Sequence, residues 1–311
     1  MADSTVGAAS CREPRFGPAP VAARCRSHGR CCKAAGAWRC KSALAGLLLA
    51  AAVAVPAAPA PELPPHAPRP GGIAVLDLGD GEARPAVRFD GDPVLTLAAD
   101  GRWFAVVGIP LDQPVGNATV TVDGGDAASL EFEVIAGDYR EQHLTVEPTY
   151  VNPGPEALER IGRERPLIAG ALNRFSETAP ATLRLAPPVP GRRSDSFGAR
   201  RFFNDEPRSP HRGMDLSGAS GTPVTAPLAG TVVLAGDFHF TGNTVILDHG
   251  QGLVTLYAHL SEIAVAEAQA VDTGDRLGLI GATGRVTGAH LHFATYLNGT
   301  PVDPALLLQA P

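Results

Sequence analysis

The chain has 311 residues, of which 44% are apolar and 19% charged, a composition typical of a folded soluble protein with one large or two ordinary domains. Residues 1–60 carry 8 Lys+Arg and 2 Asp+Glu; subtracting these from the totals of 26 and 32 leaves 18 and 30 for residues 61–311, a net charge of −12. This acidic body is a poor candidate for non-specific nucleic-acid binding, so no nucleic-acid partner is expected.

Residues 1–60 have the layout of a secretory leader. A basic run precedes "KSALAGLLLAAAVAVPAAPA", which is apolar for about a dozen residues and then turns to small residues and prolines. A membrane span, the alternative, needs about 20 apolar residues, so contact with a membrane is expected only through an uncleaved signal. The sequence predicts cleavage near residues 57–60 and export, so that the mature protein is periplasmic or secreted.

All five cysteines of the chain lie in this leader, at Cys11, Cys25, Cys31, Cys32 and Cys40. Their spacing forms no paired zinc-finger pattern, and the expected mature chain has neither a thiol nor a disulfide. Its stability must then come from the hydrophobic core, with a bound metal as an additional source.

A small β domain is predicted over residues 71–136, after a Pro-rich tether at residues 61–70. Six short runs rich in β-branched and aromatic residues, separated by turn residues, give the pattern of a small β sandwich. The runs are "IAVLDL", "AVRF", "VLTLA", "RWFAVVGI", "ATVTV" and "SLEFEVI". Residues 137–181 follow as a connector, in which "PEALERIGRERPLIAGALNRF" has helical spacing interrupted by Pro166; this predicts one broken helix or two short ones.

The β pattern resumes in residues 182–311, which are predicted to form an antiparallel, mostly β domain. Runs such as "NTVILDHG", "LVTLYAHL" and "AHLHFATYL" alternate with glycine-rich turns, and no helix longer than a turn or two is expected. The predicted fold class is therefore mostly β, with a small N-terminal β-sandwich-like domain followed by a larger C-terminal antiparallel β domain.

Histidines and an aspartate in the C-terminal domain are candidate metal ligands. In "AHLHF", His290 and His292 lie on the same face of a strand because alternate residues share a face, while their apolar neighbours can enter the core. In "HRGMD", His211 and Asp215 are four positions apart, which places them on one face of either a helix or a strand. Two histidines and one carboxylate form a familiar catalytic zinc set.

"YAHL" supplies a further histidine, His259, and alternation along the strand predicts that it shares a face with Tyr257. Four histidines and one aspartate then compete for a single ion. If all of them bind, the site is closed and structural; if three bind, two histidines remain for chemistry.

In their order and spacing, "HRGMD", "YAHL" and "HLH" resemble the three motifs of the lysostaphin/LytM-type zinc metallopeptidases, which cut peptide cross-links in bacterial cell walls. The similarity runs from Gly191 to "VDPALLL" near the end of the chain, and the family's fold is antiparallel β, which agrees with the strand pattern. The domain at residues 71–136 resembles more loosely the N-terminal domain of some exported members.

The resemblance implies a zinc site formed by His211, Asp215 and His292, with His259 and His290 as the catalytic pair. Zinc would lower the pKa of a bound water and polarise the scissile carbonyl, while the pair would move protons and stabilise the oxyanion. The division of these two tasks between His259 and His290 stays open.

The implied function is that of an exported endopeptidase whose partners are the peptide stems of peptidoglycan. D,D-endopeptidase cleavage of direct cross-links is favoured over glycyl-glycine cleavage, because the resemblance is to exported two-domain members and the composition, without lysine after Lys41, suggests a GC-rich source. The rival hypotheses are a non-catalytic module that binds the wall or activates an amidase, and a purely structural zinc site.

Other polar residues carry weaker expectations. His249 is predicted to be a turn or core histidine, and His143 and His239 are assigned no role. Asn243 and Tyr257 are candidates for the substrate groove.

Two arginines stand in the segment "SFGARRFFNDEPRSP", just before His211. Arg200 and Arg201 either meet an acidic peptide stem or lie in a solvated turn. The position of this segment makes it a candidate cover for the groove.

Overall fold

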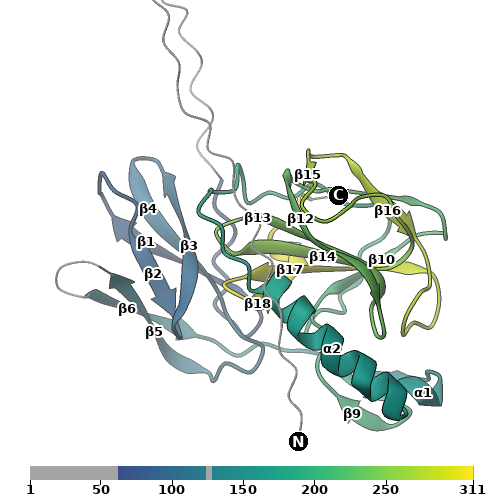
Figure 1. Ribbon diagram of the computed structural model, residues 1–311. Helices are drawn as coiled ribbons and strands as arrows, with labels where there is room; N and C mark the ends of the chain where they lie inside the picture. Colours follow the sequence, from purple (N-terminus) through teal and green to yellow (C-terminus); the bar gives the residue numbers. More distant parts are fainter. Residues whose placement is uncertain (1–61, 124–127, 311) are drawn as a thin grey trace, which may run out of the picture. The chain divides into compact units, whose positions relative to one another are not determined.

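The computed structural model describes residues 62–123 and 128–310, so the predicted leader and its five cysteines lie outside the described residues. Within them the chain is mostly β, as predicted, with two large antiparallel sheets and one long helix (Figure 1). None of the helices in this part of the chain has the length and hydropathy needed to span a membrane.

All six runs predicted for the N-terminal domain form strands, and they make one antiparallel sheet of order β1-β4-β3-β2-β5-β6. The strands are β1 (Ile73–Gly79), β2 (Ala86–Phe89), β3 (Asp92–Ala99), β4 (Arg102–Gly108), β5 (Gly116–Asp123) and β6 (Ala128–Val134). Every strand contributes to one buried cluster, in which the rings of Phe89 and Phe132 lie 5.8 Å apart. The sandwich-like packing is thus made by a single curled sheet that encloses its own core.

The C-terminal domain contains a nine-stranded antiparallel sheet whose central path is β10-β17-β14-β13-β12-β15, with β11, β16 and β18 at its margins. The strands are β10 (Met214–Ser217), β11 (Pro223–Thr225), β12 (Gly230–Phe238), β13 (Gly242–Gly250), β14 (Leu253–Ile263), β15 (Ala270–Val271), β16 (Arg276–Ile280), β17 (His290–Leu297) and β18 (Thr300–Val302). Residues 182–310 contain no helix except the short 3-10 turn η1 (Pro304–Leu306), as expected.

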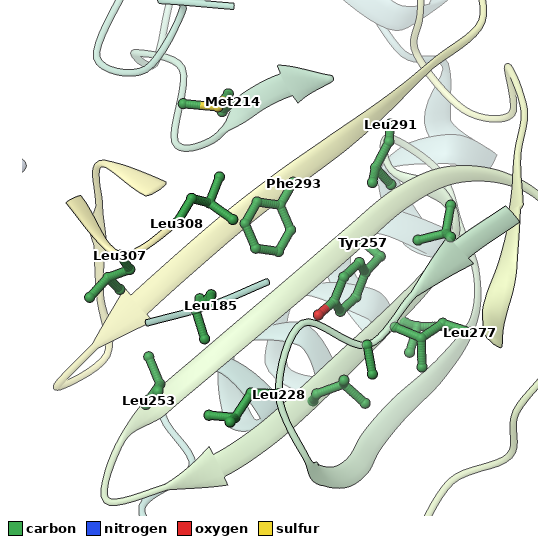
Figure 2. Close-up of a cluster of buried hydrophobic side chains, with 14 of the residues drawn as sticks. Leu185, Met214, Leu228, Leu253, Tyr257, Leu277, Leu291, Phe293, Leu307 and Leu308 are labelled. Atoms are coloured by element: carbon green, nitrogen blue, oxygen red, sulfur yellow. The ribbon is translucent and has the colours of Figure 1, made fainter. Parts of the chain in front are cut away.

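The main core lies against one face of this sheet. Tyr257 on β14 and Phe293 on β17 are fully buried with their ring centroids 5.5 Å apart. Leucines pack around them, among them Leu253 on β14, Leu291 on β17 and Leu277 on β16 (Figure 2). Because burial of each such side chain stabilises the fold by about 1.5–3 kcal/mol, this cluster fixes how the central strands lie against one another.

The main core also extends into the N-terminal sheet. Successive residues of β1 divide between two clusters: Ile73 packs in the cluster that holds Tyr257, whereas Ala74 packs inside the N-terminal sheet. In the turn after β17, the Asn298 side chain accepts a hydrogen bond from the Gly108 N–H at 2.7 Å and donates one to the Gly108 carbonyl at 3.1 Å. The two domains therefore share one continuous buried core.

The connector contains α1 (Pro148–Val151) and α2 (Pro155–Leu172). Helix α2 runs without interruption through Pro166, so the prediction of a helix broken at this residue is wrong. Pro166 lies on the exposed side of α2, where water can hydrate the Gly162 carbonyl that has lost its helical donor. On the other side, Ile168 packs against the face of the C-terminal sheet opposite the main core.

A small sheet that the sequence did not predict joins the connector to the C-terminal domain. Strand β7 (Glu141–Leu144) runs parallel to β8 (Arg200–Phe203), which pairs antiparallel with β9 (Glu206–Arg208). These strands are three or four residues long and lack an apolar alternation, so no periodicity identifies them. The β8–β9 hairpin precedes His211 directly and positions the chain where it enters the site.

Replacing Asn298 with alanine should lower the free energy of unfolding by about 2–3 kcal/mol, because the buried N–H and carbonyl of Gly108 both lose their partner. Urea unfolding followed by circular dichroism measures this change. The matched control Asn117→Ala, at an exposed position of β5, should change the free energy by less than about 0.5 kcal/mol. Equal effects of the two substitutions would contradict the role of Asn298.

Candidate metal centre

The side chains of His211, Asp215 and His292 converge in the C-terminal domain. Nε2 of His211 is 2.9 Å from Nδ1 of His292, and Oδ1 of Asp215 lies 3.3 Å and 3.2 Å from those two nitrogens. In residues 62–123 and 128–310, no other set of His, Cys, Asp and Glu side chains converges in this way. The structure therefore brings together the three residues that the sequence analysis assigned as metal ligands.

Strand pairing brings Asp215 and His292 together. β10 pairs antiparallel with β17 in a register that sets Asp215 opposite His292, so both side chains leave the sheet on one face. The neighbouring pair, Met214 and Phe293, enters the main core on the other face. His290 also lies on the Asp215 side, with its Nε2 3.6 Å from Oδ1 of Asp215, which confirms the alternation expected for "HLH".

His211 reaches the cluster from the segment that precedes β10, and it is only 2% exposed. Its Nδ1–H donates to the Ser196 carbonyl at 3.0 Å, which leaves the Nε2 lone pair directed at Asp215 and His292. Gly213 lets the His292 ring lie close to the backbone that follows His211, because a Cβ at residue 213 would lie 2.7 Å from Cε1 of His292. His211 is therefore held in the tautomer that leaves Nε2 free to act as a donor atom to a metal.

Asp215 is held as a carboxylate by its neighbours. Burial by itself raises the pKa of this carboxyl, but the hydrogen bonds and positive charge that His211 and His292 provide when their rings are protonated outweigh burial and leave the pKa well below its usual range. Arg201 on β8 contacts the second carboxylate oxygen, with Nη2 3.3 Å from Oδ2. The Arg201 side chain is only 17% exposed, so the solvated-turn alternative is wrong for this residue, whereas Arg200 is exposed.

The donor set fits a zinc ion. Ligands at zinc distances of about 2.0–2.2 Å, placed at the corners of a tetrahedron, are about 3.3–3.6 Å apart. The three observed separations, 2.9, 3.2 and 3.3 Å, are close to this spacing. Two imidazoles and one carboxylate are also donor types that zinc accepts in catalytic sites.

His259 reaches the same face through a break in strand β14. Across the stretch from Tyr257 to Leu260, β14 advances three residues while its partner β13 advances two, which makes a β-bulge. His259 has a φ of 66°, a left-handed conformation that is uncommon for a residue other than glycine. Its ring consequently lies 5.9 Å from the ring of His292.

Two expectations for Tyr257 are wrong because of this bulge. A regular strand would place Tyr257 on the face of His259, but the bulge separates the two side chains. Tyr257 does not line a groove: it is fully buried, and its hydroxyl is 2.8 Å from Thr255 Oγ1, which is 2.8 Å from Nε2 of His249. His249 is 6% exposed, so its prediction as a core histidine is confirmed.

One loop, residues 281–289 between β16 and β17, orients both remaining histidines. The Thr283 carbonyl accepts a hydrogen bond from Nδ1–H of His259, and the Gly288 carbonyl accepts one from Nδ1–H of His290, each at 2.8 Å. Because a carbonyl can only accept, each Nδ1 carries the proton and each Nε2 presents a lone pair. The two rings lie 5.1 Å apart, beside the three convergent donor atoms.

The other polar residues considered in the sequence analysis each make their own contacts. His143 stacks on Phe202 with ring centroids 4.6 Å apart, and His239 packs against Phe240 at 4.8 Å. Asn243 lies on β13 next to the bulge, where its N–H is 3.0 Å from the Thr283 hydroxyl. A place for Asn243 in a substrate groove stays a prediction.

Sequence reasoning missed the groups that hold the histidines in place. Ser196, Thr283 and Gly288 act through their backbone carbonyls, and every residue type offers a carbonyl, so nothing in the sequence marks them. Segment 196–210, a candidate cover for the groove, forms β8 and β9 and contacts the site through Ser196 and Arg201.

Comparisons of this chain with family models and with solved structures point to the same family. The model of Peptidase family M23 matches residues 209–304, and that of the Peptidase family M23 N-terminal domain matches residues 66–136. A crystal structure described as that of an M23 peptidase from Pseudomonas aeruginosa is 40% identical to this chain, with a TM-score of 0.67, and the match covers 77% of this chain and 94% of that one.

Curated relatives match the C-terminal part of the chain more locally. The peptidoglycan DD-endopeptidase ShyA of Vibrio cholerae is 42% identical over 111 residues, which are 35% of this chain and 26% of ShyA. The DD-carboxypeptidase/endopeptidase Mpg of Neisseria meningitidis is 44% identical over 94 residues, which are 30% of this chain and 22% of Mpg. The match thus spans about a quarter of the length of these relatives.

The metal-free chain should lose stability as the pH falls from 6.5 toward 4. Burial lowers the pKa of His211 and His249 to about 4 and, together with the charge of His292, that of His259 to about 3. Each imidazole therefore gains its proton in the unfolded chain first, so its stabilising contribution is full above the unfolded pKa of 6.5 and declines below it. Urea unfolding across this range measures the change, and constant stability would contradict the assigned burial effects.

Proposed function

The chain belongs to peptidase family M23, and from this premise we propose that it is an exported zinc endopeptidase that hydrolyses peptide cross-links in bacterial peptidoglycan. The observation that carries the proposal is the convergence of His211, Asp215 and His292, with two further imidazoles beside them. The names of the relatives support the substrate class, because ShyA and Mpg are both endopeptidases and ShyA acts on peptidoglycan.

We assign the three convergent residues as zinc ligands: His211 through Nε2, His292 through Nδ1 and Asp215 through a carboxylate oxygen. Three protein ligands are the number typical of catalytic zinc sites, whereas structural sites use four. When bound, zinc supplies a Lewis acid that polarises a carbonyl and lowers the pKa of a water molecule.

His259 and His290 handle the protons in this proposal. Each presents an unprotonated Nε2, because its Nδ1–H donates to a backbone carbonyl. One imidazole takes a proton from the attacking water and returns it to the amine that leaves when the amide bond breaks. The other, after taking a proton from solvent at Nε2, donates a hydrogen bond to the oxyanion that forms on the substrate.

We propose D,D-endopeptidase cleavage of direct cross-links in preference to glycyl-glycine cleavage, with the protein acting in the periplasm or outside the cell. The DD activities in the names of ShyA and Mpg support this preference. The leader pattern of residues 1–60 supports this location, because a secretory leader directs export and peptidoglycan lies outside the cytoplasmic membrane.

The substitution His292→Ala should abolish both zinc binding and hydrolysis, because a ligand is lost. His290→Ala and His259→Ala should each keep zinc at about one ion per chain and lower the hydrolysis rate by about 10²- to 10⁴-fold. Elemental analysis of the purified variants, alongside a hydrolysis assay, makes the distinction. Equal loss of zinc in His290→Ala and His292→Ala would show that the division between ligand and catalyst is wrong.

Purified protein should convert cross-linked muropeptide dimers to monomers and leave pentaglycine intact. A chelator should stop the conversion and added zinc should restore it, because the ligand set requires a metal for activity. Mass spectrometry of the products measures both reactions. Cleavage of pentaglycine with the dimers left intact would reverse the proposed bond specificity.

A further inference from the structure

Arg285 is an unpaired cation held between two aromatic rings. Its guanidinium carbon lies 4.5 Å from the centre of the Phe203 ring and 4.6 Å from that of Phe240. Among the described residues, no carboxylate forms an ion pair with Arg285 and no acceptor receives a hydrogen bond from its side chain. The two rings bind its faces, so the N–H groups along its edge are left for another partner.

The surroundings of Arg285 are short of negative charge. Burial, together with the nearby charges of Arg201 and Arg208, lowers the pKa of Arg285 to about 10, so the group stays protonated at neutral pH. Arg208 is balanced by Glu206 at 2.7 Å, and Arg201 contacts the cluster carboxylate of Asp215 at 3.3 Å. Of these three arginines, Arg285 is the one whose charge no described side chain balances. This is notable because the net charge of residues 61–311 is strongly negative.

The position of Arg285 ties it to the catalytic pair. It stands in loop 281–289, between the two carbonyls of Thr283 and Gly288 that orient His259 and His290. Its own N–H donates to the Phe240 carbonyl at 2.9 Å, which anchors this part of the loop to the turn between β12 and β13. Its side chain is partly exposed, so a ligand can reach it from solvent.

The Phe203 ring connects Arg285 to the metal centre. Arg201 also faces this ring, with its guanidinium carbon 6.0 Å from the ring centre, and Arg201 contacts Asp215. A peptide advances about 3.3 Å per residue when extended. A substrate group a few residues from the bond at the metal centre therefore falls within reach of Arg285.

We propose that Arg285 is a specificity-determining residue that binds a carboxylate of the peptide substrate close to the scissile bond. A guanidinium edge binds a carboxylate through two parallel hydrogen bonds, and a partly desolvated setting strengthens that pair. Arg201 already contacts Asp215 and donates a hydrogen bond to Gln142. It therefore adds positive charge, but only part of its guanidinium edge is available to a substrate carboxylate. The enzyme consequently selects peptide stems whose carboxylates are free over stems in which they are amidated.

This inference rests on the proposed function for the identity of its ligand, a stem peptide. The probe is a tetrapeptide stem in two forms, one with free carboxylates and one with every carboxylate converted to a primary amide. Isothermal titration calorimetry with the full chain measures the affinity for each form without any need for hydrolysis. The free form should bind about tenfold more tightly, as expected for one charge-assisted pair.

In Arg285→Gln this preference should fall to about one, through loss of affinity for the free form alone, and Arg285→Lys should recover part of it. The matched control Arg276→Gln, an exposed arginine of the same domain, should keep the preference. Equal affinity of the unmodified protein for both forms, or an unchanged preference in Arg285→Gln, overturns the inference. Equal weakening of both forms together with a lower melting temperature also overturns it, because that result assigns Arg285 a structural role.

The same preparation is assayed on cross-linked dimers. If the dimers stay intact while the Arg285-dependent preference is present, the endopeptidase proposal fails and the carboxylate site stands. If the dimers are cleaved and the preference is absent, the endopeptidase proposal stands and the carboxylate site fails.

Discussion

The antiparallel pairing of β10 with β17 is the constraint on which the site depends. It sets Asp215 opposite His292 on one face of the sheet and Met214 opposite Phe293 on the other. A shift of β10 by one residue would move Met214 out of the main core and the Asp215 carboxylate into it, so the hydrophobic pattern holds the register strongly. The distance between Asp215 and His292 is therefore fixed by apolar packing on the far side of the sheet.

Backbone carbonyls fix the orientation and the tautomer of three histidines in the site. Those of Ser196, Thr283 and Gly288 each accept from an imidazole Nδ1–H and so decide which nitrogen of His211, His259 and His290 is available. Orientation by a carbonyl adds no charge to the site. The arrangement leaves Asp215 as the carboxylate of the cluster, in contact with Arg201, and it suits a site that is to receive a divalent cation.

Much of this arrangement follows from the sequence, and the parts that do not have identifiable physical reasons. Alternation along "HLH" identifies the shared face of His290 and His292, because β17 is a regular strand. The same reasoning fails for Tyr257 and His259, since a bulge depends on how β14 pairs with β13 and not on the letters of β14. Pro166 does not break α2, because an exposed helix face tolerates a lost hydrogen bond.

The core shared by the two sheets limits how far the chain can be treated as modular. Ile73 and Leu95 from the N-terminal sheet belong to the same cluster as Leu297 of β17, and that strand also carries His292. Excising the C-terminal domain would leave this apolar surface in contact with water. The N-terminal sheet thus acts as an intramolecular support for the strand that carries His292, and recombination with another protein would have to transfer both domains together.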